Sequence, residues 1–150
     1  MIKLKDILNE VTAYNAWIKP DMQMLAQEFR VEHEKKGRRY FANQKQFLEA
    51  AQSAEVRTID KATDRSIGNR SHTRTFDELH NLIKRYKSYP KYRNEEKLED
   101  MYKRLGNNKP MDMPIVFEDH NGELEVFSGN TRMDIAFQMG IEPKVLVIKV

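Results

Sequence analysis

The segment Gly129-Asn-Thr-Arg132 places a glycine three residues before an arginine, directly after a run that is typical of a strand. A glycine at the end of a strand can adopt backbone angles that other residues avoid, so a helix can begin at once. The unpaired N–H groups of such a helix start, with the positive end of its dipole, attract anions. Arg132 adds a forked guanidinium that suits phosphate. We therefore predict a phosphate site formed by Gly129, Asn130, Thr131 and Arg132.

Phosphoryl chemistry at such a site would also need charge neutralisation and a positioned base or metal ion. Mg2+ is usually held by one or two carboxylates together with phosphate oxygens. Asp112, just before the first strand of the expected sheet, is our first candidate for the metal ligand or the catalytic base. His72 is the catalytic candidate among the histidines. Glu118 and Asp119 come second, because acids in a hairpin are usually only solvated.

Basic side chains are concentrated in the middle of the sequence. Residues 57–93 carry ten basic and four acidic side chains, a surplus of six positive charges, whereas the whole chain has a net charge of +3. The part from 57 to 74 is polar and weakly periodic, so we expect an irregular loop there. It is either a lid that lays Arg65, Arg70, His72 and Arg74 across a phosphate-bearing ligand or a solvated linker.

The second part of this basic segment alternates aromatic and positively charged side chains. Its tyrosines can stack on bases while Lys84, Arg85 and Lys87 hold the phosphate backbone. Alternatively, Tyr86 and its neighbours anchor the end of a helix on the core with their hydroxyls in water. Nucleic-acid binding by residues 57–93 is thus one hypothesis of two.

The elements around Arg132 are clearly marked. Asn121-Gly122 between two apolar runs predicts a hairpin of residues 114–117 and 124–127. Apolar side chains on several faces of the following helix predict that it is buried. Gly140 can end that helix, and the run from Val145 to Val150 is too apolar for a half-exposed strand.

Helices are expected in the rest of the chain. Leu4, Ile7, Leu8 and Val11 have helical spacing, and we predict that this first helix ends before Lys19-Pro20 and pairs with a second one. The second is capped by Asp21 and ends before Gly37. Further helices are expected over residues 44–54, from the capping box Thr75-Phe-Asp-Glu78 to a point before Pro90, and over residues 94–105.

The composition indicates one folded domain with a heavily charged surface, since 39% of the 150 residues are hydrophobic and 33% are charged. The absence of cysteine excludes disulfides, thiolate metal sites and cysteine nucleophiles, and fits a reducing cytoplasm. The charged first residues do not resemble a signal peptide, and no apolar run approaches the ~20 residues of a membrane span. We expect a cytoplasmic protein without a membrane partner.

The C-terminal motifs resemble the ParB/sulfiredoxin fold. In that family a strand hairpin leads to a Gly-x-x-Arg phosphate loop, a short helix with a small residue four after the arginine, then Gly, Pro and a closing strand. Gly129, Arg132, Ala136, Gly140 and Pro143 occur in this order, and the segment from Lys109 to Val116 is similar to the family's other signature. The resemblance implies an α+β fold: a helical region, residues 1–74, packed on a ParB/sulfiredoxin-like domain with a small mixed sheet, residues 75–150.

The resemblance also implies certain activities and excludes others. Sulfiredoxin chemistry needs a cysteine after the motif glycine, where this chain has Asn130. Partition-type ParB proteins follow this fold with a DNA-binding domain, and since the sequence ends at Val150 we do not expect a CTP-gated DNA clamp. Asn130 and Thr131 also replace the charged pair of the partition motif, which weakens a transfer of CTP specificity. The combination also resembles small proteins of tailed phages.

Two functions therefore remain open. The first is a nucleotide- or nucleic-acid-phosphate-binding protein with Mg2+-dependent phosphoryl chemistry of the NTPase, kinase or nuclease type, acting on a nucleoside triphosphate or diphosphate or on a phosphodiester. The second is a non-catalytic module that binds DNA, RNA or a protein partner through the basic segment 57–93.

Overall fold

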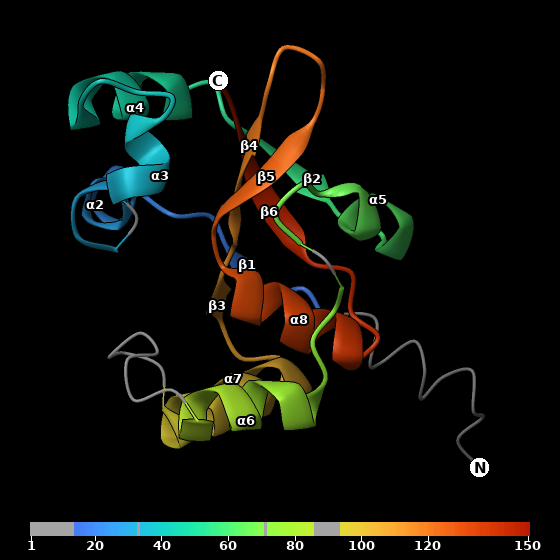
Figure 1. The fold of residues 1–150 in the computed structure, drawn as a ribbon. Helices are drawn as coiled ribbons and strands as arrows, with labels where there is room; N and C mark the ends of the chain where they lie inside the picture. Colours follow the sequence, from blue (N-terminus) through green and yellow to red (C-terminus); the bar gives the residue numbers. More distant parts are fainter. Residues whose placement is uncertain (1–13, 33, 71, 86–93) are drawn as a thin grey trace.

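The computed structural model describes residues 14–32, 34–70, 72–85 and 94–150. The chain is of the expected α+β class, and its centre is a four-stranded mixed sheet (Figure 1). The strand order is β2 (Glu55–Thr58), β6 (Lys144–Lys149), β4 (Ile115–Glu118) and β5 (Leu124–Ser128). Strand β6 runs parallel to β4, whereas the outer pairs β2–β6 and β4–β5 are antiparallel.

The hairpin of β4 and β5 is present as predicted. The Oδ1 atom of Asp119 accepts hydrogen bonds from the backbone N–H groups of Asn121 and Glu123, at 2.8 and 2.9 Å. Gly122 follows with φ +79°, in the left-handed region that glycine adopts without strain. The predicted apolar strand is β6, whose four middle residues are buried between β2 and β4.

The two faces of the sheet bury alternate side chains of the same strands, as the pleat requires. Leu146 and Ile148 of β6 pack with phenylalanines that include Phe47 of α4 (Gln44–Ala51) and Phe29. Val145 and Val147 point to the other face, where they pack with Met133 and Phe137 of α8 (Asn130–Gln138). The sheet therefore lies between the N-terminal helices and α8 (Figure 1).

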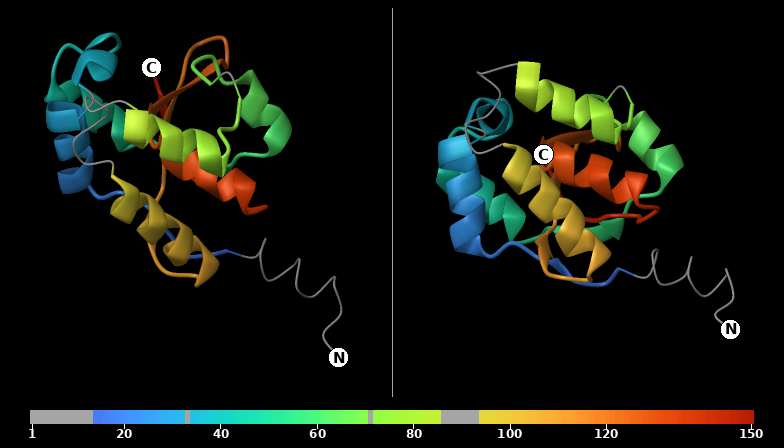
Figure 2. Two further views of the ribbon diagram at one scale, coloured as in Figure 1. Left: turned by 60° about the horizontal axis from the view of Figure 1, so that its bottom comes forward. Right: turned by 90° about the horizontal axis from the view of Figure 1, so that it is seen from below.

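Two further helices lie against the side of α8 that faces away from the sheet. They are α6 (Phe76–Arg85) and α7 (Glu95–Gly106), and Figure 2 shows both beside α8. Leu79 of α6 and Leu98 of α7 share a core cluster with Ile135 and Ala136 of α8. Helix α8 thus separates two hydrophobic clusters, which explains why residues 131–137 are all buried.

The capping signals in this part of the sequence are confirmed. Thr75 Oγ1 accepts from the N–H of Glu78 at 3.2 Å, and Glu78 Oε1 accepts from the N–H of Thr75 at 3.3 Å, which is the reciprocal bonding of a capping box. Asn94 caps α7 by accepting from the N–H of Lys97.

The N-terminal region differs from the prediction in two places. Residues 4–11, on which the first helix was predicted, lie outside the described residues, but Trp17 and Ile18 form strand β1 (Trp17–Ile18), parallel to β3 (Met111–Asp112). Gly37 does not follow the second helix. It lies inside α3 (Glu34–Arg38), after α2 (Met22–Gln27) and a π-helical turn over Glu28–Glu32.

The ring of Phe29 explains the position of Gly37. A Cβ atom at residue 37 would lie 2.4 Å from Cε2 of Phe29, so the ring fits only against a bare backbone. The glycine is a packing residue here and not a helix end. The third expected helix, over residues 44–54, is confirmed in position as α4 and is three residues shorter than predicted, since it ends at Ala51.

The prediction of an irregular loop over residues 57–74 is also wrong in part. Strand β2 includes Arg57 and Thr58, and Asp60 caps the short helix α5 (Lys61–Ser66) by accepting from the N–H of Thr63. Both elements are too short and too polar to produce clear periodicity. Pairing with β6 fixes β2, so a tertiary contact decides what local sequence does not.

Asn69, which follows α5, covers the outer edge of β5. Its Nδ2 donates to the carbonyl of Val126 and its Oδ1 accepts from the N–H of Val126, both at 2.9 Å. The N–H of Gly68 donates to the carbonyl of Leu124 at 3.0 Å. These bonds satisfy backbone groups of an edge strand that would otherwise be open to another chain.

Among the residues that the structure describes, no helix is long and apolar enough to cross a bilayer.

Candidate functional site

The start of α8 has the geometry that the Gly-x-x-Arg motif predicts. Gly129 is the N-cap residue with φ +108°, and no side chain caps the helix. A Cβ at this position would lie 2.8 Å from Cβ and 2.9 Å from Cα of Pro114. Glycine is therefore required twice, for its left-handed conformation and for the close approach of Pro114. The uncapped helix start directs its N–H groups out of the first turn.

The guanidinium of Arg132 is held beside this turn. Its Nη1 donates to the backbone carbonyl of Asp112 at 2.9 Å, and its Nη2 donates to Oγ of Ser128 at 3.2 Å. The same hydroxyl donates to Oε2 of Glu28 at 3.1 Å. Arg132 is 9% exposed, so its orientation is fixed by these contacts rather than by solvent.

Arg132 lines a cavity of about 530 Å3, a size in the range of small-molecule sites. Met111, Asp112 and Ser128 also line it, and α7 contributes Lys97, Asp100 and Arg104. The full lining comprises Ile18, Glu28, Lys97, Asp100, Met101, Arg104, Pro110, Met111, Asp112, Ser128 and Arg132. Three cations and three carboxylates therefore meet in one cavity.

Two of these charged side chains, Arg104 and Asp100, form an ion pair. Nε of Arg104 lies 2.8 Å from Oδ2 of Asp100, and Nη1 of Arg104 donates to the carbonyl of Pro110 at 3.2 Å. The hydrogen bond with Asp100 raises the pKa of the Arg104 guanidinium, so this side chain keeps its positive charge. Both side chains are about half exposed, which leaves the pair weakly held at the cavity rim.

The predicted acid and the predicted histidine lie in different places. Asp112 lines the cavity of Arg132 and contacts that arginine through its backbone carbonyl. His72 does not line that cavity; its Nε2 lies 2.8 Å from Oε2 of Glu78, and its side chain is 56% exposed. The structure thus brings Asp112, but not His72, to Arg132.

The two second-choice acids have structural partners. Arg57 of β2 forms an ion pair with Glu118 of β4, with Nη2 2.9 Å from Oε1, and this hydrogen bonding lowers the pKa of the Glu118 carboxyl. Asp119 accepts the two backbone bonds of the hairpin turn.

Arg70 and Arg74, predicted as lid residues, contact buried carboxylates. Nε of Arg70 lies 2.5 Å from Oδ1 of Asp64, and its Nη2 lies 2.7 Å from Oδ1 of Asp134. Nε of Arg74 lies 2.7 Å from Oδ2 of Asp134, and Thr73 donates to Asp64 at 3.2 Å. The side chains of Arg70, Asp64 and Asp134 are at most 3% exposed, so this network ties α5 and the following segment to α8.

These lid candidates nevertheless meet Asn130 at the start of α8. A second, smaller cavity of about 240 Å3 is lined by Asn69, Arg70, His72, Arg74 and Asn130. Nη1 of Arg70 donates to both the side-chain and the backbone oxygen of Asn130 at 3.2 Å. The middle segment is therefore placed at the start of α8, as the lid hypothesis expects, although Arg70 itself is engaged within the protein.

The remaining predicted nucleic-acid contacts lie apart from both cavities. Arg65 of α5 and Lys84 and Arg85 at the end of α6 are exposed. Lys87 and the three tyrosines of the basic segment lie outside the described residues.

Sequence reasoning missed Glu28 and the three charged residues of α7. A weak signal existed for Asp100 and Arg104, whose i,i+4 spacing predicts an ion pair on one helix face. Glu28 begins the π-helical turn, a feature that is frequent at functional sites but has no reliable sequence mark. Their approach to Arg132 depends on how α7 and the N-terminal helices pack.

Comparisons of the chain with protein-family models, with curated proteins and with solved structures found no match.

Proposed function

We propose that this protein binds a nucleotide through its phosphates at the start of α8, and that it is a member of the ParB/sulfiredoxin superfamily with Mg2+-dependent phosphoryl chemistry. One observation carries the proposal: a buried arginine is fixed beside an uncapped, glycine-initiated helix start and lines a cavity of about 530 Å3.

The order and pairing of the C-terminal elements support the family assignment. The hairpin of β4 and β5 leads into Gly129, α8 follows at once, and Gly140 ends it with φ +72°. Strand β6 then returns parallel to β4. The elements thus follow one another in the order that the ParB/sulfiredoxin motif has: hairpin, Gly-x-x-Arg turn, helix, glycine, proline and closing strand.

The cavity offers distinct groups for the phosphates and for a metal ion. The guanidinium of Arg132 would hold the phosphate oxygens, while Lys97 and Arg104 would add charge from α7. Gly129, Asn130 and Thr131 do not line this cavity, so the N–H groups of the helix start would act on a phosphate only through its approach to the first turn. Asp112 remains the first metal ligand in the proposal, with Glu28 as a second carboxylate. Two carboxylates and phosphate oxygens are the usual ligands of Mg2+ at such sites. When bound, the ion would neutralise charge on the transferred phosphoryl group.

Nucleotide titration tests the proposal directly. We would measure binding of ATP, ADP, CTP and GTP with Mg2+ to the full chain by calorimetry, and analyse each mixture for products. We expect at least one nucleotide to bind, and Arg132→Gln to weaken that binding by about tenfold or more, because a charge-assisted bond to phosphate is worth roughly 1.5–3 kcal/mol.

Two further variants make the result specific. Lys97→Ala changes an exposed rim residue, so it should weaken binding without affecting the fold, even if Arg132→Gln is unstable. Arg65→Ala removes an exposed arginine that does not line the cavity and should leave the affinity unchanged.

Absence of binding for all four nucleotides, or equal binding by wild type and Lys97→Ala, would contradict the nucleotide proposal. The module that binds nucleic acid through the basic segment would then be the better explanation. In that case, affinity for single-stranded DNA or RNA should fall steeply with salt, and Lys84→Ala with Arg85→Ala should reduce the slope.

A further inference from the structure

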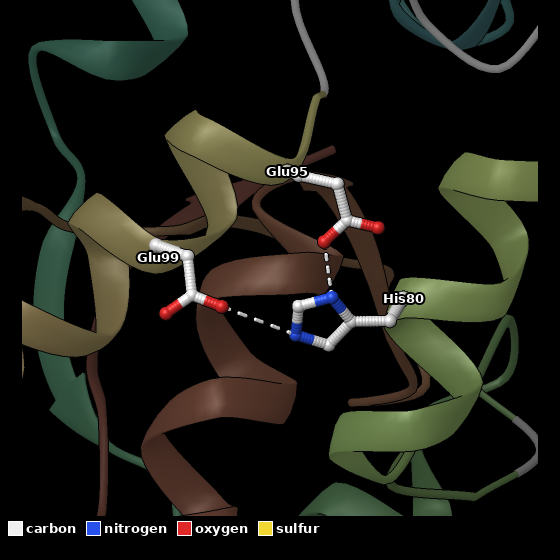
Figure 3. A group of neighbouring side chains, drawn as sticks. All are labelled: His80, Glu95 and Glu99. Carbon is white, nitrogen blue, oxygen red and sulfur yellow. Dashed lines mark hydrogen bonds and ion pairs between the residues drawn. The ribbon is translucent and has the colours of Figure 1, made fainter.

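Three potential metal ligands face one another between α6 and α7. His80 lies in the middle of α6, and Glu95 and Glu99 lie in the first turns of α7. Because the two glutamates are four residues apart, they project from the same face of the helix. Figure 3 shows the imidazole between the two carboxylates. None of the three residues lines the cavity of Arg132.

The three side chains are close enough to share one ion. Nδ1 of His80 is hydrogen-bonded to Oε2 of Glu95, and its Nε2 lies 3.5 Å from Oε1 of Glu99. One potential ligand atom from each residue lies within 4.8 Å of the other two. Ligand atoms around a tetrahedral zinc ion are about 3.4 Å apart, since each Zn–N or Zn–O bond is about 2.0–2.2 Å. Since Nδ1 faces Glu95 and Nε2 faces Glu99, an ion bound to Nδ1 beside Glu95 needs the Glu99 carboxylate to rotate toward that edge of the ring, and the Glu99 side chain is 52% exposed.

The surroundings hold the imidazole in place. The ring of His80 stacks on Phe76 with ring centroids 5.4 Å apart and an interplanar angle of 8°, and Phe76 in turn stacks on Tyr102 of α7. Leu79 and Leu98, next to the ligands on either helix, are buried in the same core cluster. The backbone positions of the three ligands are therefore fixed by packing, as a binding site requires.

One oxygen of the cluster has no hydrogen-bond partner. Oε1 of Glu95 is buried, although the Glu95 side chain as a whole is 39% exposed, and among the described residues nothing donates to this oxygen. A buried carboxylate oxygen without a partner is costly, and each such atom in a native fold calls for an explanation. A cation bound beside Oε2 would supply the missing interaction, through a second metal–oxygen bond or through a water ligand.

We propose that His80, Glu95 and Glu99 bind one divalent transition-metal ion, of which Zn2+ fits best, and that the ion links α6 to α7. One imidazole nitrogen with two carboxylates and water is a ligand set suited to zinc, whereas Mg2+ and Ca2+ prefer oxygen ligands alone. The site is separate from the proposed nucleotide cavity, so each can fail without the other.

The test is a Zn2+ titration of chelator-treated full-length protein by calorimetry, with MgCl2 as the competing hard cation. We expect one Zn2+ per chain, no comparable binding of Mg2+, and a rise of the unfolding temperature on addition of Zn2+. Glu95→Gln and Glu99→Gln keep the shape of the side chain and remove its charge. Each should weaken Zn2+ binding by about tenfold or more, since even the loss of a group that only supports a metal ligand commonly lowers the affinity about 10–100-fold, and each should reduce the thermal shift.

Three controls decide the outcome. His80→Ala should abolish the binding, Glu96→Gln should not alter it because Glu96 is exposed and not part of the cluster, and His120→Ala should not alter it because that residue lies in the hairpin turn. Circular dichroism shows whether each variant is folded. Absence of Zn2+ binding in the wild type, or equal affinity in wild type, Glu95→Gln and Glu99→Gln, would overturn the proposal and leave only direct contacts between the imidazole of His80 and the two carboxylates.

Discussion

Two buried arginines of this chain have different environments, and the difference assigns them different roles. Arg70 contacts the carboxylates of Asp64 and Asp134, both of them buried. Arg132 donates to a backbone carbonyl and to a hydroxyl and lines a cavity. A buried charge must be paired and hydrogen-bonded, and Arg70 meets this condition within the protein. Its network is therefore structural, whereas Arg132, which lines the larger of the two cavities, is the better candidate for an external anion.

The structural role of Arg70 can be tested through its partner. Asp134→Asn removes the carboxylate charge that Arg70 and Arg74 share, and the loss of one member of a buried pair costs about 3–5 kcal/mol. Asp100→Asn breaks an exposed pair with Arg104, in which both side chains are about half exposed, and should cost less than about 1 kcal/mol. Urea unfolding gives both values. A loss below 1 kcal/mol for Asp134→Asn would indicate that Arg70 and Arg74 can exchange these partners for a ligand.

At the scale of elements, the start of α8 depends on a glycine between a strand and a helix. Strand β5 ends at Ser128 and α8 begins at Asn130, so one residue makes the whole connection. That residue, Gly129, has a left-handed backbone and lies against Pro114. The direction in which the helix start points is therefore set by the contact of two loop residues.

A comparison of Gly129 with Gly122 separates the two requirements at this turn, the left-handed conformation and the close contact with Pro114. Gly129→Ala should lower the free energy of unfolding by about 1–2 kcal/mol, because alanine would have to adopt the left-handed conformation. It should lower it by about a further 1–3 kcal/mol because the new Cβ would crowd Pro114. Gly122→Ala should lose only the part that comes from the left-handed conformation, because its Cβ would meet no atom within 4 Å. Urea unfolding of both variants would show the difference. Equal losses would mean that Pro114 moves away and that the turn is less tightly defined than the geometry indicates.

At the scale of the whole molecule, two tyrosine hydroxyls connect parts of the chain that are far apart in sequence. Tyr14 donates to the carbonyl of Lys109, and Tyr102 of α7 donates to Oε1 of Gln138 at 2.9 Å. Burial raises the pKa of each phenol to about 12, from the ordinary value of 10.0. Both lie in the cluster formed around α6, α7 and α8.

This burial predicts a loss of stability in alkali. The pKa of each phenol is higher in the folded than in the unfolded state, so the contribution to stability is complete below pH 10 and is lost as the pH rises from 10 through 12. Urea unfolding of the wild type at about pH 9 and about pH 11 should show a falling free energy. Tyr102→Phe should cost about 1 kcal/mol at neutral pH and should reduce the fall. A slope unchanged in Tyr102→Phe would contradict this account.

Local patterns were sufficient for most of the C-terminal part. The Asn-Gly hairpin, the glycine-initiated helix, its burial and the closing apolar strand are each marked by residues that can adopt few other conformations. The capping box at Thr75 and the cap at Asn94 likewise predicted where helices begin. Arg132 and Asp112 also line one cavity, where Nη1 of Arg132 donates to the backbone carbonyl of Asp112.

Only the tertiary structure decided what surrounds that turn. Strand β2 has no strong local signal and exists because β6 offers it a partner, and Gly37 is explained by the ring of Phe29 rather than by the end of a helix. Glu28, Lys97 and Arg104 reach the cavity of Arg132 from two other elements, and Glu95 meets His80 across two helices. Sequence thus determined the turn and its arginine, since backbone geometry and capping act over a few residues. The cavity and the cluster of His80, Glu95 and Glu99 depend on contacts between segments that are distant in sequence. Only the packing of the core brings those segments together.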